Sequence, residues 1–187
     1  MSESPSSRAD ADHEEIERKY LLSALPALPE GTEMLRIEQG YLPDPADEAG
    51  EGEGPRPEGR VRRIIEPDGS VRMTHTIKTG RGVRRTEIER AITAEEFDRY
   101  WPLTEGRRVR KRRYRARDAR AGTARVWEID AFEDRDLVLA EVELSTADEA
   151  IAFPAWLAPH VRREVTEDAS YRNYALAVGE TSGGGAG

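Results

Sequence analysis

The sequence predicts an α+β fold built on an eight-stranded antiparallel closed β-barrel with flanking helices. Three observations lead to this prediction. Many short segments alternate between polar and apolar residues, as half-buried strands do. Only three helix starts are signalled. Charged residues recur on one face of several segments while the opposite faces are apolar, a pattern that fits a barrel with a polar interior.

The strands are expected wherever side chains of one kind recur every second residue. One hairpin is marked by the turn Pro67-Asp68-Gly69, because these residue types favour tight turns. The eight segments that show the alternation are 14–22, 34–42, 59–66, 71–79, 84–92, 108–117, 124–132 and 137–145.

Three helices are expected from their capping residues. Capping boxes at Thr93–Glu96 and Thr146–Glu149 open two helices, which we expect to run to about Leu103 and to Pro154. Asp168 can cap a third helix over 169–178. So few helices beside eight strands favour an antiparallel sheet.

Composition indicates one domain over 13–179, with a disordered segment at 1–12, a flexible acidic loop at 43–59 and a flexible tail at 180–187. The net charge of −8 argues against a general nucleic-acid or membrane binder. There is no cysteine, which excludes disulfides and thiolate chemistry. No apolar run reaches the length of a membrane span, so we expect a cytoplasmic protein; a homodimer is left open.

The charged faces are sorted by sign. Residues two apart on a strand share a face, so the first, seventh and eighth strands each present paired acids, and the third and sixth present paired bases. Solvated surfaces usually mix the two signs. The tracks comprise Glu15, Glu17 and Lys19; Arg60 and Arg62; Lys78; Arg85, Glu87 and Glu89; Lys111 and Arg113; Glu128 and Asp130; and Glu141 and Glu143.

Two interpretations of this pattern remain open. The sheet could be an ordinary one with a face in water. Alternatively, the apolar face turns outward under the helices and the charged faces look at one another across a barrel. Acid pairs in such an interior need divalent cations and basic pairs need anionic oxygen, which together make a polyphosphate site. Oxygen ligands favour Mg²⁺ or Mn²⁺, while the three scattered histidines do not suggest a metal site.

Motifs along the chain carry a resemblance to a known family. The run Glu15-Ile-Glu17-Arg-Lys19 has the form E-x-E-x-K and resembles the N-terminal signature of the CYTH superfamily of triphosphate tunnel metalloenzymes. The remaining family pattern follows in order over about 14–178: Gln39-Gly-Tyr-Leu42, Arg60-Val-Arg62, Thr76-Ile-Lys78, Arg85-Thr-Glu87-Ile-Glu89, Lys111-Arg-Arg113, Glu128-Ile-Asp130, Glu141-Val-Glu143 and Tyr171-Arg-Asn173.

The resemblance implies a triphosphate tunnel fold that binds a triphosphate and one or two divalent metals. The implied catalytic residues are Glu15, Glu17 and Lys19. The implied metal ligands or their supports are Glu15, Glu17, Glu128, Asp130, Glu141 and Glu143. The implied substrate-binding residues are Lys19, Arg60, Arg62, Lys78, Arg85, Lys111 and Arg113. Glu87 and Glu89 would orient basic residues or a water, and Tyr171 and Arg172 would lie where the C-terminal helix plugs the tunnel.

The favoured function is hydrolysis of inorganic tripolyphosphate, as the resemblance is to bacterial inorganic triphosphatases. The alternatives are an adenylyl cyclase that makes cyclic AMP, a thiamine triphosphatase, and a noncatalytic phosphate-binding module. Additional arginines on the sixth strand, Arg110 and Arg112 among them, are expected on the opposite face from Lys111, either as a solvated rim or as a stripe that contacts RNA.

Overall fold

The computed structural model describes residues 16–43, 59–79, 86–118, 125–146 and 148–179. The expectations for 1–12, for 180–187 and for nearly all of the acidic loop lie outside these ranges, as do Glu15 and Arg85. Over the described chain, no helix has the length and apolarity needed to cross a membrane.

The described strands form one antiparallel sheet. Their order is β5-β4-β3-β2-β6-β7-β8-β1-β9. The eight expected strands are confirmed, each to within two residues of its predicted ends. Their bounds are β1 Ile16–Leu22, β2 Glu33–Tyr41, β3 Arg60–Ile65, β4 Val71–Thr79, β5 Thr86–Ala91, β6 Arg108–Asp118, β7 Arg125–Phe132 and β8 Val138–Leu144.

A ninth strand, β9 at Val161–Glu164, was not predicted. Its four residues show no two-residue alternation, and it forms by pairing with the free edge of β1. The sheet therefore has β5 at one edge and β9 at the other, and among the described residues no pairing joins these two edges. A mostly antiparallel β fold is thus established, whereas closure into a barrel is not seen.

The helices follow their predicted starts only in part. α1 (Ala94–Tyr100) has the expected capping box, in which the Thr93 hydroxyl accepts from the Glu96 amide at 3.1 Å. A short 3-10 helix at Trp101–Thr104 continues it. The C-terminal helix is divided into a 3-10 turn at Ala169–Tyr171, capped by Asp168, and α2 at Asn173–Val178.

The helix predicted after Thr146 is wrong. Residues 148–154 are not helical, because Glu149 binds the Ser145 amide at 2.9 Å and pairs with Arg125 instead of capping a helix. The extended segment lays Phe153 on Tyr20, with the ring centroids 4.9 Å apart. The apolar residues of this segment therefore cover a sheet face without forming a helix.

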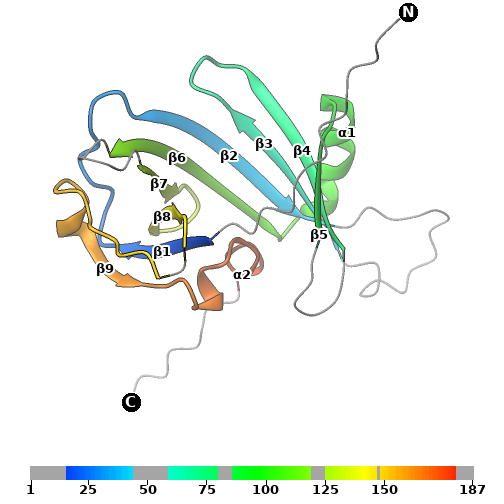
Figure 1. Cartoon of the computed structure of the whole chain (residues 1–187). Coiled ribbons are helices and arrows are strands. Elements are labelled where there is room, and N and C mark those ends of the chain that lie inside the picture. The colour runs from blue at the N-terminus through cyan, green and yellow to red at the C-terminus, as the bar shows by residue number, and fades with distance from the viewer. Residues whose placement is uncertain (1–15, 44–58, 80–85, 119–124, 147, 180–187) are drawn as a thin grey trace, which may run out of the picture.

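The apolar core lies mainly on one face of the sheet, which we call the outer face. Segment 151–157 covers it over β1, β7 and β8, where Trp127 and Ile129 are buried. α1 covers it over β3 and β4, where Phe97 packs against Val61. Figure 1 shows α1 beside β4 and β5 at one end of the sheet, while α2 contacts β6 and β2 in the middle of the strand order. The opposite face is left for the charged residues.

Candidate functional site

Strand register places the predicted charged residues on one face of the sheet, which we call the inner face. Cross-strand partners share a face, and Glu17 pairs with Glu143, Lys19 with Glu141, and Arg113 with Asp130. The predicted residues that the structure brings onto this face are Glu17, Lys19, Arg60, Arg62, Lys111, Arg113, Glu128, Asp130, Glu141 and Glu143. In the β4 backbone, Lys78 occupies a position with the same parity as these residues.

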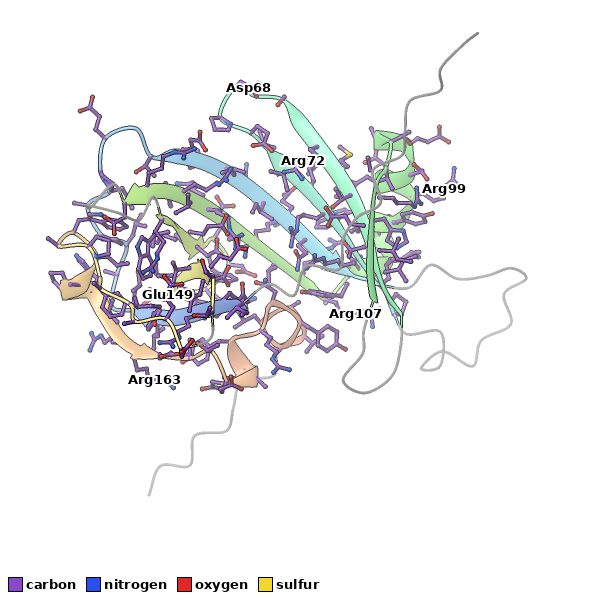
Figure 2. All side chains as sticks on the ribbon, viewed as in Figure 1. Asp68, Arg72, Arg99, Arg107, Glu149 and Arg163 are labelled. Carbon is purple, nitrogen blue, oxygen red and sulfur yellow. The ribbon has the colours of Figure 1, made fainter. Side chains whose placement is uncertain are left out.

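Charged side chains that do not belong to the inner face lie elsewhere on the molecule. Figure 2 shows Asp68 at the tip of a hairpin, Arg99 on α1 and Arg163 on β9, all at the periphery of the molecule. On β6, Arg110 and Arg112 lie on the outer face as parity predicted. They pair with Glu38 at 3.4 Å and with Glu133 at 2.9 Å. Both arginines are about half exposed, with 49% and 56% of their side chains accessible.

Arg113 is the centre of an ion-pair network on the inner face. Its guanidinium donates to both carboxylate oxygens of Asp130 at 2.7 Å and to Glu141 at 2.7 Å, and it also contacts Glu128. Burial alone disfavours the charge on Arg113, but the surrounding carboxylates outweigh it and raise the pKa of this side chain. Arg113 therefore stays charged and has a fixed orientation.

Lys111 and Asp130 form a pair sealed from water. The Lys111 ammonium donates to Asp130 at 2.6 Å and to Asn173 of α2 at 3.4 Å. Only 2% and 1% of the two side chains are exposed. Burial lowers the pKa of Lys111 despite the attraction of Asp130. Burial also opposes ionisation of Asp130, but Lys111 and Arg113 together hold the pKa of its carboxyl below the usual range.

The acidic end of the inner face lies on β1 and β8. Lys19 donates to Glu141 at 2.8 Å. Burial and the neighbouring Asp130 disfavour the charge on Glu141, but the nearby cations prevail and lower the pKa of its carboxyl. Glu17 and Glu143 are cross-strand partners and both are exposed. Two carboxylates so placed offer oxygen ligands at the open part of this face.

The basic end lies on β3. Arg60 and Arg62 stand side by side on the inner face. Burial, followed by repulsion from Arg60 and Arg113, lowers the pKa of Arg62 to about 10. Glu89 of β5 lies 3.8 Å from Arg60 and accepts a hydrogen bond from Thr76 at 2.8 Å. An excess of positive charge here favours an anionic ligand.

Three polar residues of the inner face were missed as site residues. Gln39 and Tyr41 occupy the alternate positions of β2, and Asn173 begins α2. Gln39 hydrogen-bonds both Arg62 and Tyr41. The sequence signal was the two-residue spacing of Gln39 and Tyr41. No sequence spacing connects Asn173 with Lys111, since that contact depends on how α2 docks.

α2 closes one end of the inner face. Leu176 and Ala177 pack with Val109, Phe132 and Leu139 in an apolar cluster. Tyr171 lies against the same cluster, while Arg172 is exposed. The inner face is therefore apolar beneath α2 and at the cluster of Leu35, Ile37 and Ile64 on β2 and β3, and the charged residues lie between these two regions.

The carboxylates of the inner face are mostly held by basic side chains. Within the described ranges, no three acidic or histidine residues already converge as a metal cage. Glu128, Asp130 and Glu141 are ion-paired with basic side chains of this face. Glu17 and Glu143 on β1 and β8, and Glu89 on β5, lie at exposed parts of it. All the candidate ligands are oxygens, which suits a hard divalent cation.

Comparisons with known proteins identify relatives along nearly the whole chain. No family model matches. A Nitrosomonas europaea protein named inorganic triphosphatase is 36% identical over 173 residues, which cover 88% of this chain and 97% of the relative. The crystal structure of the inorganic triphosphatase NE1496 matches with a TM-score of 0.62 and 33% identity, over 87% of this chain and 97% of that one. A second structure, described as the hypothetical protein NE1496, matches at a TM-score of 0.59 and 33% identity, over 88% and 97%.

Proposed function

We propose a function for this chain on the premise that it belongs to the inorganic triphosphatase family, within the CYTH superfamily of triphosphate tunnel proteins. The proposed reaction is hydrolysis of inorganic tripolyphosphate to pyrophosphate and phosphate. The observation that carries the proposal is the inner face. It joins a basic end at Arg60 and Arg62 to an acidic end at Glu17 and Glu143, with the Arg113 network between them. A polyanion with bound cations matches this distribution of charge.

The basic side chains would bind the phosphate oxygens. Arg62 hydrogen-bonds the neutral Gln39 and Arg60 lies 3.8 Å from one carboxylate, that of Glu89, so the two arginines together keep a net positive charge for a ligand. Lys19, Arg113 and Lys111 extend the cationic track, and we assign Lys78 and Arg85 to it from their place in the pattern. Cations fixed before the substrate arrives need little reorganisation during the reaction.

We assign the metal site to the carboxylates of β1 and β8. Glu17 and Glu143, together with Glu15, would hold Mg²⁺ or Mn²⁺ through oxygen ligands. When bound, such a cation neutralises phosphate charge and polarises a phosphoryl oxygen. Glu128, Asp130 and Glu141 would act by holding Arg113, Lys111 and Lys19 in place, since the structure pairs them with these residues.

The chemistry requires no covalent intermediate. Water attacks the terminal phosphorus and gives up a proton, and the bond between this phosphorus and the bridging oxygen breaks. Pyrophosphate is the leaving group, and the terminal phosphoryl group becomes phosphate. Lys19 and the arginines stabilise the negative charge on the transferring phosphoryl group and on the leaving pyrophosphate. Glu17 is placed to orient the attacking water or to accept its proton.

We infer further that the sheet curls round the substrate as a tunnel. Lys111, Asp130 and Glu141 are all buried although they lie on the charged face, so this face is already shielded from water. Such burial of ionised groups is tolerated because they are paired. A triphosphate held there would be surrounded on several sides by β1, β6, β7 and β8.

A substrate panel tests the proposal. The protein is incubated with tripolyphosphate, thiamine triphosphate, ATP and 5′-triphosphorylated RNA, each with Mg²⁺ or Mn²⁺, and phosphate, pyrophosphate and cyclic AMP are measured. We expect phosphate release with tripolyphosphate as the best substrate. Cyclic AMP with pyrophosphate from ATP would identify a cyclase, preference for thiamine triphosphate a thiamine triphosphatase, and binding without turnover a noncatalytic module.

A matched pair of variants tests the acidic end. Glu17→Gln keeps the shape of the side chain and removes its charge, and we expect kcat/KM to fall by about 100-fold. Arg18→Ala is the control, because Arg18 is the next residue of β1 and faces outward, 4.0 Å from Glu164. Equal activity of the two variants would rule out the metal role of Glu17.

A further inference from the structure

Gln39 is an amide buried in the middle of the inner face. None of its surface is exposed, and it lies between Arg62 of β3 and Val109 of β6 in the register. The Arg62 Nε donates to the Gln39 Oε1 at 2.8 Å, and the Gln39 Nε2 donates to the Tyr41 hydroxyl at 2.6 Å. Arginine has donors only, so the amide oxygen must face Arg62 and the amide nitrogen must face Tyr41.

The chemistry of this position is distinctive because the acceptor is neutral. Arg113 is surrounded by carboxylates, whereas within the described ranges Gln39 is the one hydrogen-bond acceptor of Arg62. A carboxylate at position 39 would pair with Arg62 and cancel its charge. An apolar side chain would leave the Arg62 Nε without a partner and the guanidinium without a fixed orientation.

Tyr41, the second hydrogen-bond partner of Gln39, is also held in place. The ring of Tyr41 meets the ring of Tyr174 of α2 edge to face, with the centroids 5.2 Å apart. Burial raises the pKa of Tyr41 even though Arg60 and Arg62 oppose this, so its hydroxyl stays protonated. Because this oxygen already accepts from Gln39, its own hydrogen is directed away from the amide.

We propose that Gln39 is a positioning residue, which sets the Arg62 guanidinium and the Tyr41 hydroxyl for the triphosphate while leaving the charge of Arg62 unneutralised. The inference rests on the proposed function, since it concerns the same substrate site. Gln39 need not touch the substrate, because it acts through the two groups that it holds. Adding a charge at position 39, or removing the hydrogen bond that Gln39 makes with Arg62, should therefore weaken binding of the triphosphate.

Two substitutions at position 39 test the proposal, with Val61→Ala as the control. Gln39→Met keeps the volume and removes both hydrogen bonds, and Gln39→Glu keeps an acceptor and adds a charge. Val61 is fully buried, adjacent to Arg62 and on the opposite face, so Val61→Ala reports general loss of stability. Each protein is assayed for the KM and kcat of tripolyphosphate with Mg²⁺, for the dissociation constant of tripolyphosphate by calorimetry, and for melting temperature.

We expect both Gln39 variants to raise KM and the dissociation constant by about tenfold, Gln39→Met through the lost hydrogen bond to a charged group and Gln39→Glu through the negative charge added beside Arg62. Val61→Ala should leave both within about twofold of the wild type while it lowers the melting temperature. If Gln39→Met lowers the melting temperature but leaves KM and the dissociation constant unchanged, Gln39 is merely structural and the inference fails.

The outcome for Gln39 is separable from that for the proposed function. A wild-type protein that binds tripolyphosphate without hydrolysing it would refute the proposed activity, and the dissociation constants of the variants would still decide the role of Gln39. A wild-type protein that does not bind tripolyphosphate would overturn both.

Discussion

Neutralising Asp130 should destabilise the protein more than any other conservative change on the inner face. Asp130→Asn keeps the shape of the side chain but removes the charge that partners Lys111 at 2.6 Å and Arg113 at 2.7 Å. Lys111 is 2% exposed, so its ammonium has no access to water once Asp130 is neutral. Among the residues that the structure describes, the hydrogen-bond partner left to Lys111 is Asn173, at 3.4 Å.

The magnitude follows from the burial of the pair. Removing one partner of a buried ion pair leaves an uncompensated charge and costs about 3–5 kcal/mol of unfolding free energy. For a domain of this size each kcal/mol lowers the melting temperature by about 2–4 °C, so we expect a fall of about 6–20 °C. Glu38→Gln is the control on the outer face. Its partners Arg63 and Arg110 are 35% and 49% exposed, and we expect a loss of about 1 kcal/mol.

Urea denaturation of the wild type, Asp130→Asn, Glu38→Gln and the double variant Lys111→Met with Asp130→Asn measures these differences. The double variant should recover part of the loss, since it removes the stranded charge as well. Tripolyphosphate should stabilise Asp130→Asn in proportion to its affinity. A loss for Asp130→Asn no greater than that for Glu38→Gln would show that the buried pair does not carry the energy assigned to it.

Two further predictions concern packing and protonation. A Cβ added at Gly40 would lie 2.3 Å from the buried Thr104 hydroxyl, so Gly40→Ala should cost about 1–3 kcal/mol in a thermal melt, and an unchanged melt would show that Thr104 yields freely. Asp130 and Glu141 have pKa values below their ordinary 3.8 and 4.5, so they stabilise the fold above these values. Wild-type stability should therefore fall as the pH drops below about 4.5, and Asp130→Asn should show a shallower fall in pH-dependent denaturation.

The strands and their charged faces were predictable because side-chain direction on a strand depends only on parity. Eight strands were located, and Lys111 and Arg113 fell on the opposite face from Arg110 and Arg112, as expected. β9 was not predictable, because a four-residue edge strand forms through its partner β1 and not through its own pattern. The helix after Thr146 was predicted wrongly because its capping-box signature is used differently: the Glu149 carboxylate accepts from the Ser145 amide and pairs with Arg125.

By itself, the sequence determined which side chains share the charged face, because that follows from the two-residue repeat along each strand. Only the tertiary structure decided which of them meet. Arg113 gathers Glu128, Asp130 and Glu141 because β6, β7 and β8 are neighbours in register, and Lys111 is sealed because α2 docks over it. Such pairings depend on strand order and helix docking between segments far apart in the chain, and no local spacing encodes these.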